Sequence, residues 1–264
     1  MSLVFSAFTP HPPLLLDAIS GETSDLLPKT RKSFEHLRDE LYLAQPETII
    51  IISPHGESYK DSFGVCAHPL LHTNLRPFGD AITRDSFSTD LELTSHLFEA
   101  CKKEKIACSA IPLPDLDYGA AIPLLMLGSA LPHVKVIVVH PMQGTPKNAM
   151  DFGYALKGVI LQTNKRVALI ASGDLSHRLE TESPGGFHKD AHSFEKKIQE
   201  IIMNGNSMGL LSLDQKTVNE VATCSYEPLL ILFGVLGRMK TNPEILSYEA
   251  PQGIGFLTVY FPIF

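Results

Sequence analysis

Histidine is the residue type whose placement suggests chemistry in this sequence. His11, His55, His140 and His177 each lie at the end of a short apolar run or in the polar turn that follows it. Neutral imidazole is the commonest metal ligand in proteins, and imidazole also titrates near neutral pH. One such histidine alone more often satisfies the backbone of a turn than binds a metal. Several at the same topological position predict convergence on one site of metal or acid–base chemistry.

A carboxylate would complete such a site. Two histidines and a carboxylate on one face of a metal form the facial triad of non-haem Fe(II) enzymes, which leaves positions open for substrate and O2. Glu227 is our candidate, because Pro228 suits the first turn of an apolar helix expected over residues 229–239. The dipole at a helix N-terminus favours the ionised carboxylate. Simple capping of the helix accounts for Glu227 equally well.

The elements that must position these residues alternate along the chain. Continuous apolar runs rich in β-branched residues predict buried strands at 3–8, 48–52, 106–111, 134–139, 167–171 and 254–261. Amphipathic segments of helical length occupy 24–44, 89–105, 119–130, 147–162 and 191–204. We therefore expect a single α/β domain over residues 1–264, with a mostly parallel central sheet flanked by helices. The metal site should lie at the carboxyl ends of the strands.

Composition narrows the class of protein. The 264 residues are 44% hydrophobic, which predicts a globular chain, and no apolar run reaches the roughly 18–20 residues that span a bilayer. The N-terminus lacks the basic region of a signal peptide, and the four cysteines form no CxxC pair. We expect a cytoplasmic protein with reduced thiols. A formal net charge of −7 argues against nucleic-acid binding, which needs cationic side chains for the phosphates.

Five segments resemble one family. TPHPPLL (9–15), SPHG (53–56), SGDLSH (172–177), Glu227-Pro228 and YEAPQGIG (248–255) are similar to motifs of the class III extradiol ring-cleavage dioxygenases. This is the family of the catalytic beta subunit of protocatechuate 4,5-dioxygenase. The motifs occur in the family's order and cover nearly the whole chain. Within the family, the chain is most similar to the dioxygenase-like domain often joined to an AMMECR1 domain, and more distantly to the Memo proteins.

The resemblance implies Fe(II)-dependent extradiol cleavage of a catechol with O2, in the catabolism of aromatic compounds. Carried over by position, His11, His55 and Glu227 match the metal ligands, and His177 matches the active-site acid/base. The resemblance also implies a homo-oligomer and, as a partner, a separate AMMECR1-type protein. Tyr118 departs from the pattern, because the family often has a second pocket histidine there.

Several alternatives stay open from the sequence. We place Tyr118, His140 and Asp174 around the site, with Asp174 shaping the turn before His177. Cys224 is either a small buried side chain or a ligand in a Memo-like site. Zinc suits the same ligands as iron, so a zinc-dependent hydrolase on this scaffold is one alternative. A non-enzymatic, Memo-like metal-binding or regulatory protein is the other.

Overall fold

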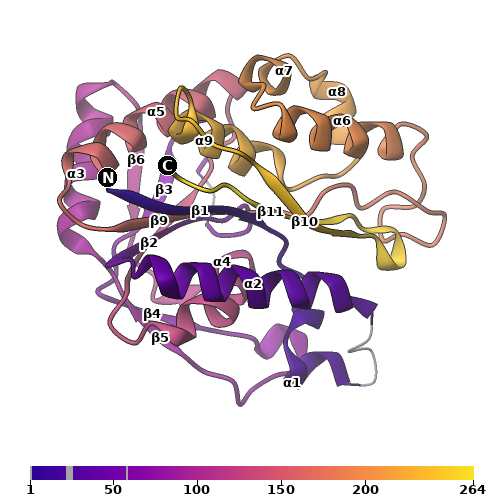
Figure 1. Ribbon diagram of the computed structural model, residues 1–264, viewed down its shortest axis with the longest axis horizontal. Coiled ribbons are helices and arrows are strands. Elements are labelled where there is room, and N and C mark those ends of the chain that lie inside the picture. The colour runs from indigo at the N-terminus through magenta and orange to yellow at the C-terminus, as the bar shows by residue number, and fades with distance from the viewer. Residues whose placement is uncertain (1, 22–25, 58) are drawn as a thin grey trace.

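A computed structural model describes residues 2–21, 26–57 and 59–264 of the chain. An eight-stranded sheet lies between layers of helices, in the order β10-β11-β1-β9-β2-β8-β3-β6 (Figure 1). Its central strands run parallel and are the most buried. They are β1 (Leu3–Thr9), β9 (Val167–Ser172), β2 (Thr48–Ile52) and β8 (Lys135–His140). These are four of the predicted strands, so the α/β fold with a mostly parallel sheet is confirmed.

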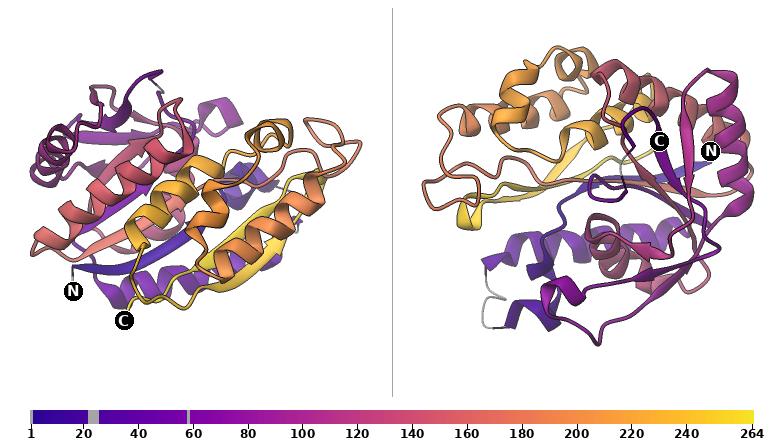
Figure 2. Two further views of the ribbon diagram at one scale, coloured as in Figure 1. Left: turned by 90° about the horizontal axis from the view of Figure 1, so that it is seen from above. Right: turned by 180° about the vertical axis from the view of Figure 1, so that it is seen from behind.

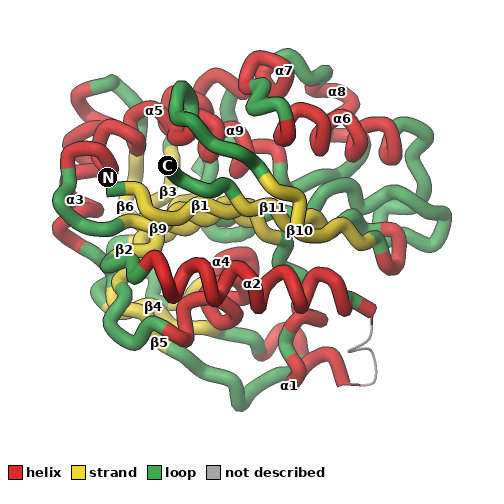
Figure 3. Tube along the Cα trace, in the orientation of Figure 1, coloured by secondary structure: helices red, strands yellow, loops and turns green. Residues whose placement is uncertain are grey.

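Antiparallel pairs extend the sheet on both sides. β11 (Phe256–Tyr260) pairs with β1, and β10 (Glu244–Glu249) pairs with β11 at that edge. On the other side, β3 (Phe63–Cys66) is antiparallel to β8, and β6 (Cys108–Ile111) is the edge strand. A separate small sheet contains β5 (Ser86–Ser88), β4 (Leu70–Thr73) and β7 (Asp115–Leu116). Figure 3 shows these strands in yellow.

The helices divide between the two faces of the sheet. Side chains of Ile50 and Ile52 enter one apolar core, while Ile49 and Ile51 enter the other. Burial on both faces explains why the strands read as continuous apolar runs. The first core is covered by α3 (Leu91–Lys103), α5 (Pro146–Gln162), α6 (Ala191–Met203), α7 (Ser207–Leu211), α8 (Gln215–Glu220) and α9 (Tyr226–Leu236). The second is covered by α2 (Pro28–Ala44) and α4 (Tyr118–Leu127), with α1 (Asp17–Ser20) beside them.

The helix predicted over 24–44 begins at Pro28 among the described residues, and its expected start at residue 24 lies outside them. Short 3-10 turns occupy Pro13–Leu15, Arg76–Phe78, Gly128–Ala130 and Pro251–Gly253. Among the helices of the described residues, none is both long and apolar enough to cross a bilayer.

Helices α5 and α9 lie side by side on the first face (Figure 2, left). Their backbones meet where two glycines face each other. A Cβ on Gly153 would collide with the carbonyl oxygen of Ile231, and a Cβ on Gly234 would lie 2.5 Å from the carbonyl oxygen of Met150. Glycine at both positions therefore lets the helices approach more closely than any side chain would permit. This contact fixes α9, whose first turn points to the carboxyl edge of the sheet.

An ion-pair cluster lies at the opposite, amino end of the parallel strands. The buried carboxylate of Asp90 accepts hydrogen bonds from Thr48 Oγ1 at 2.6 Å and from Lys165 Nζ at 2.8 and 2.9 Å. It also caps α3 through the amide of Leu93. Lys165 reaches Glu92 as well, at 2.8 Å. Each of these charges therefore has a partner of opposite sign.

Candidate metal centre and active site

His11 is held in one tautomer by the end of β9. Its Nδ1 lies 2.8 Å from Ser172 Oγ, and that hydroxyl donates its single proton to the carbonyl of Gly119 at 2.6 Å. Ser172 must therefore accept a hydrogen bond from His11, so the imidazole proton is on Nδ1. His11 Nε2 therefore carries no proton, which is the state that a metal ligand needs, and its lone pair faces His55 and Cys224. His11 is fully buried, between the two prolines of the turn after β1.

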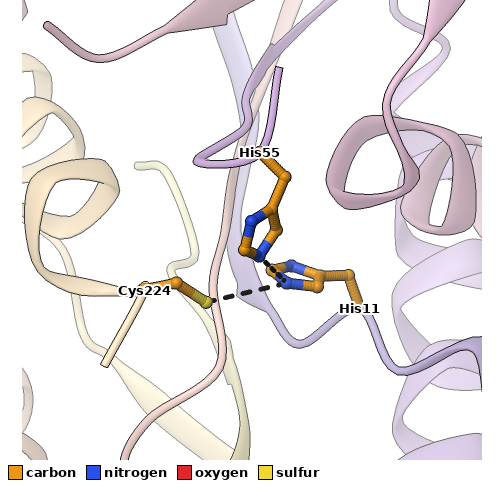
Figure 4. A group of neighbouring side chains, drawn as sticks. All are labelled: His11, His55 and Cys224. Carbon is orange, nitrogen blue, oxygen red and sulfur yellow. Dashed lines mark hydrogen bonds between the residues drawn. The ribbon is translucent and has the colours of Figure 1, made fainter. Parts of the chain in front are cut away.

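His55 faces His11 from the turn after β2. The two Nε2 atoms lie 3.0 Å apart, and the rings meet edge to face (Figure 4). Burial is the main reason why the pKa of His11 falls to about 3 and that of His55 to about 4. The positive charge of one ring would also lower the pKa of the other. Both imidazoles are therefore neutral at pH 7 and available to a cation.

Cys224 completes this group from the loop between α8 and α9. Its Sγ lies 3.7 Å from His11 Nε2, and the donor atoms of His11, His55 and Cys224 all lie within 4.8 Å of one another (Figure 4). Burial and the nearby Asp174 carboxylate raise the thiol pKa well above its ordinary value. The thiol thus carries its proton when no cation is near, and a bound metal would displace it.

Asp174 and His177 lie beside Cys224 and form a second group with it, again within 4.8 Å. Asp174 Oδ1 accepts a hydrogen bond from the amide of His11 at 3.1 Å, and Oδ2 lies 3.5 Å from His11 Nε2. Burial raises the pKa of Asp174 to about 6. The side chain therefore links two loops of the site in addition to its place in the turn before His177.

The orientation of His177 comes from a strained residue. Its Nδ1 donates to the carbonyl of Ala222 at 2.7 Å, which leaves Nε2 as the free nitrogen. Ala222 has φ +53°, in the left-handed region that non-glycine residues seldom adopt. Such conformations persist where the surrounding structure imposes them, and they cluster at active sites. The sequence contains no signal for this contact.

The donor set fits a metal ion. Ligand atoms at about 2.0–2.3 Å from a tetrahedral metal lie about 3.4–3.7 Å apart, close to the 3.0 and 3.7 Å separations here. The two neutral imidazoles bring their Nε2 atoms close together, and the carboxylates of Asp117 and Asp174 lie near enough to act on His55 electrostatically. A cation between the two Nε2 atoms would accept both lone pairs, and the negative charge of the carboxylates would stabilise it.

Glu227 is placed differently from the histidines. It lies in the first turn of α9, as expected, and burial raises the pKa of its carboxyl group. It belongs to neither group of close donor atoms among the described residues, where Cys224 is the third donor beside His11 and His55. The ligand set of His11, His55 and Glu227 stays a prediction, and Cys224 enters as the nearer donor.

Tyr118 packs on the His55 ring, and His140 lies behind the turn that carries His55. His140 is buried behind the His55 turn, with Nδ1 bonded to the carbonyl of Ser53 at 3.0 Å and Nε2 3.6 Å from Cys66 Sγ. It lies in neither donor group. The ring of Tyr118 stacks on that of His55, with centroids 4.4 Å apart and planes at 15°. Tyr118 therefore fixes the plane of the His55 ring from the position where the family often has histidine.

A surface groove of about 1300 Å³ lies elsewhere, between α3 and α5, and none of the side chains of the two donor groups lines it. The two donor groups thus lie apart from this groove, in the turns beyond the strand ends and in the loop before α9.

Two known proteins are similar to this chain over nearly all of its length. "Protein CA_C1420" of Clostridium acetobutylicum is 28% identical over 97% of this chain, which spans 57% of that relative's length. The crystal structure of the uncharacterized protein JW3007 from Escherichia coli K12 has a TM-score of 0.66 and 18% identity, covering 97% of this chain and 99% of that one. The second likeness shows a shared fold.

A family model described as the catalytic LigB subunit of aromatic ring-opening dioxygenase matches residues 6–259. That span contains every strand-end histidine, Cys224 and Glu227. With its histidines gathered at the carboxyl edge of a mostly parallel sheet, this chain belongs to the LigB family of aromatic ring-opening dioxygenase catalytic subunits.

Proposed function

We propose that this protein is a non-haem Fe(II) dioxygenase that opens a catecholic ring beside its diol. The observation that carries the proposal is the group of two neutral histidines and a thiol with the free Nε2 of His177 alongside. Membership of the LigB family supports a dioxygenase-type enzyme. The donor set supports a metal.

His11, His55 and Cys224 would hold the iron, which supplies Lewis acidity toward a catechol hydroxyl and a path for electrons to O2. The chain's own part begins with orientation. Ser172 fixes the His11 tautomer, and the stacked Tyr118 ring fixes the plane of His55. Loss of the Cys224 proton on loading gives the thiolate that a metal requires.

His177 is placed to move the substrate proton. Its Nδ1 is committed to the Ala222 carbonyl, so a hydroxyl proton from substrate is accepted at Nε2 and returned from the same atom. The imidazolium that forms lies beside the Asp174 carboxylate, whose negative charge stabilises it. Acid–base catalysis of this kind contributes about 100-fold to 10,000-fold.

The test is anaerobic loading with Fe(II), followed by O2 uptake with a panel of catechols. We expect uptake with a ring-opened product, abolished in His55→Ala together with metal content. His177→Ala should keep the metal and lose at least about 100-fold in rate. His133→Ala, an exposed histidine on the surface, is the matched control and should behave as wild type. No uptake by a fully loaded wild-type protein with any catechol would reject the dioxygenase.

The third ligand is decided by a pair of variants. We expect Cys224→Ser to weaken metal binding by more than about 100-fold, because it removes a direct donor, whereas Glu227→Gln leaves it within about tenfold. Cys66→Ser is the control for loss of a buried thiol. The reverse ranking of Cys224→Ser and Glu227→Gln would restore the carboxylate as ligand.

The thiol also supports a second candidate. Sulfur and imidazole donors together are typical of zinc, so a zinc-dependent hydrolase-like enzyme fits the same group of residues. The metal that purifies with the protein separates the two, because iron with O2 uptake supports the first and zinc without it supports the second. Binding of either metal without turnover would favour a Memo-like binding protein.

A further inference from the structure

The YEAPQGIG segment (248–255) contributes no side chain to the two donor groups, yet its Gly255 pairs with the loop that carries His177. The amide of Leu175 donates to the carbonyl of Gly255 at 2.8 Å, and the amide of Gly255 donates to the carbonyl of Ser176 at 3.0 Å. This segment therefore forms one wall behind the 174–177 loop. The proposed reaction assigns no role to it.

A buried carboxylate joins this wall to the loop. Glu195, on α6, is 2% exposed. Its Oε1 accepts the amide of Ser176 at 2.9 Å, and its Oε2 accepts a hydrogen bond from the hydroxyl of Tyr248. A Cβ on Gly255, just before β11, would collide with the carboxylate, so a side chain there would displace Glu195 from these donors. A buried carboxylate persists only where such donors satisfy it.

Ser176 directly precedes His177, and each of its polar groups is engaged. Its hydroxyl donates to the carbonyl of Val221 at 2.9 Å, while the amide of His177 donates to the same carbonyl at 3.2 Å. Val221 is followed by Ala222, whose carbonyl orients the His177 ring. Glu195 thus fixes the backbone from which both the imidazole and its hydrogen-bond acceptor are positioned.

We propose that Glu195, held by Tyr248, is a positioning residue that sets the orientation of His177 through the amide of Ser176. The proposal rests on the proposed role of His177 in proton transfer. It also gives the C-terminal motif a function: Tyr248 anchors the carboxylate, and Gly255 makes room for it and pairs with the loop.

Three variants test the proposal. Glu195→Ala removes both hydrogen bonds, Glu195→Gln keeps an acceptor for Ser176, and Tyr248→Phe removes only the hydroxyl. With Fe(II) and an accepted catechol, we expect Glu195→Ala to lower kcat about 100-fold with unchanged iron content, since small misplacement of a reacting group costs that much. Tyr248→Phe should lower kcat about tenfold, and Glu195→Gln should restore most of the rate. Tyr248→Phe also serves if Glu195→Ala does not fold.

A second readout does not depend on turnover. Amide hydrogen exchange at Ser176 should accelerate at least about tenfold in Glu195→Ala, because the amide loses its acceptor. Nitrogen NMR of His177 should change from a single Nδ1–H tautomer to a mixture. Both are measured on metal-free protein, so they report on Glu195 even if no catechol is oxidised and the proposed function fails.

Glu249 offers a matched control in the same motif. Its carboxylate also accepts backbone amides and a hydroxyl, from Lys29 and Thr30 at the start of α2, away from His177. Glu249→Ala should lower the melting temperature without changing kcat or the His177 spectrum. The proposal is overturned if Glu195→Ala lowers only the melting temperature, as Glu249→Ala does, and leaves the tautomer and kcat unchanged.

Discussion

The two ends of the parallel strands carry polar side chains of opposite character. At the amino end, Asp90, Lys165 and Thr48 pair charge with charge and donor with acceptor. At the carboxyl end, His11 and His55 are neutral and face each other, beside a protonated thiol. The paired charges of the amino end stabilise the fold without a ligand. The neutral donors of the carboxyl end are arranged so that they could bind a cation.

The contrast has a physical origin. A buried carboxylate stays ionised where cationic and hydroxyl donors reach it, and such contacts hold the pKa of Asp90 below its usual value despite burial. Burial of His11 and His55 outweighs the nearby carboxylates of Asp117 and Asp174, so the pKa values of these imidazoles fall and they lose their proton. Stability and ligand binding are thus assigned to opposite ends of the same strands.

The largest effect should come from breaking the amino end. Asp90→Ala removes the hydrogen bonds to Thr48 and Lys165 and the cap of α3, and we expect a loss of about 3 kcal/mol in the free energy of unfolding. Urea denaturation measures it, and metal content should be unchanged. The exposed pair Lys147–Asp151 is the control, since Asp151→Ala should cost less than about 0.5 kcal/mol. Equal losses in the two variants would contradict the assignment.

A second prediction separates the two ends by pH. In metal-free protein, the pKa values of His11 and His55 are near 3 and 4 in the folded state and 6.5 in the unfolded chain. Below pH 6.5 the unfolded chain therefore binds more protons at these histidines than the folded protein does, and the free energy of unfolding decreases as pH falls. Asp174, raised from 3.8 to about 6, opposes part of this loss. The contribution of Asp90, whose pKa is lowered from 3.8, is lost only at still lower pH.

Urea midpoints at pH 7 and pH 5 measure this difference. We expect wild type to be less stable at pH 5. His55→Asn should reduce the difference, and Asp174→Asn should enlarge it, while Asp90→Ala shifts both midpoints alike. A wild-type protein equally stable at the two pH values would show that the carboxyl end does not exclude protons.

The smallest effect concerns the strain at the carboxyl end. Ala222→Gly should raise the free energy of unfolding by at most about 1 kcal/mol, because glycine adopts φ +53° without a steric penalty. The more flexible backbone of glycine should hold the carbonyl of residue 222 less firmly in place for His177 Nδ1. We therefore expect kcat to fall modestly while the free energy of unfolding rises. Loss of stability in Ala222→Gly would show that the left-handed residue is unstrained.

The strand ends could be predicted from the sequence because continuous apolar runs identify buried parallel strands, and their carboxyl ends converge. His11, His55 and His177 lie in turns beyond their strands and reach the site. His140 is the last residue of β8 and pairs with Gly64, and it lies in neither donor group of the described residues, so its place around the site stays a prediction. The homo-oligomer and the AMMECR1-type partner stay predictions.

Other features have no comparable signal in the sequence. Cys224 arrives from a loop between two helices, where neither periodicity nor a strand end indicates the site. The edge strand β10 is partly exposed, so its residues form no continuous apolar run that would distinguish the strand from the turn before it. In the sequence, Glu195 is an ordinary helical glutamate, and only the fold shows that its carboxylate lies against Gly255, just before β11.

The glycine contact between α5 and α9 extends the constraints on the metal centre to positions remote from it. Cys224 lies just before α9, and Gly234 lies about 12 Å along that helix from its first residue, Tyr226, at 1.5 Å per residue. A larger side chain at Gly153 or Gly234 would push the helix from its neighbour and carry the thiol with it. A substitution in either helix can therefore disturb the proposed metal site without touching its ligands, and a compensating change in the other helix can restore it.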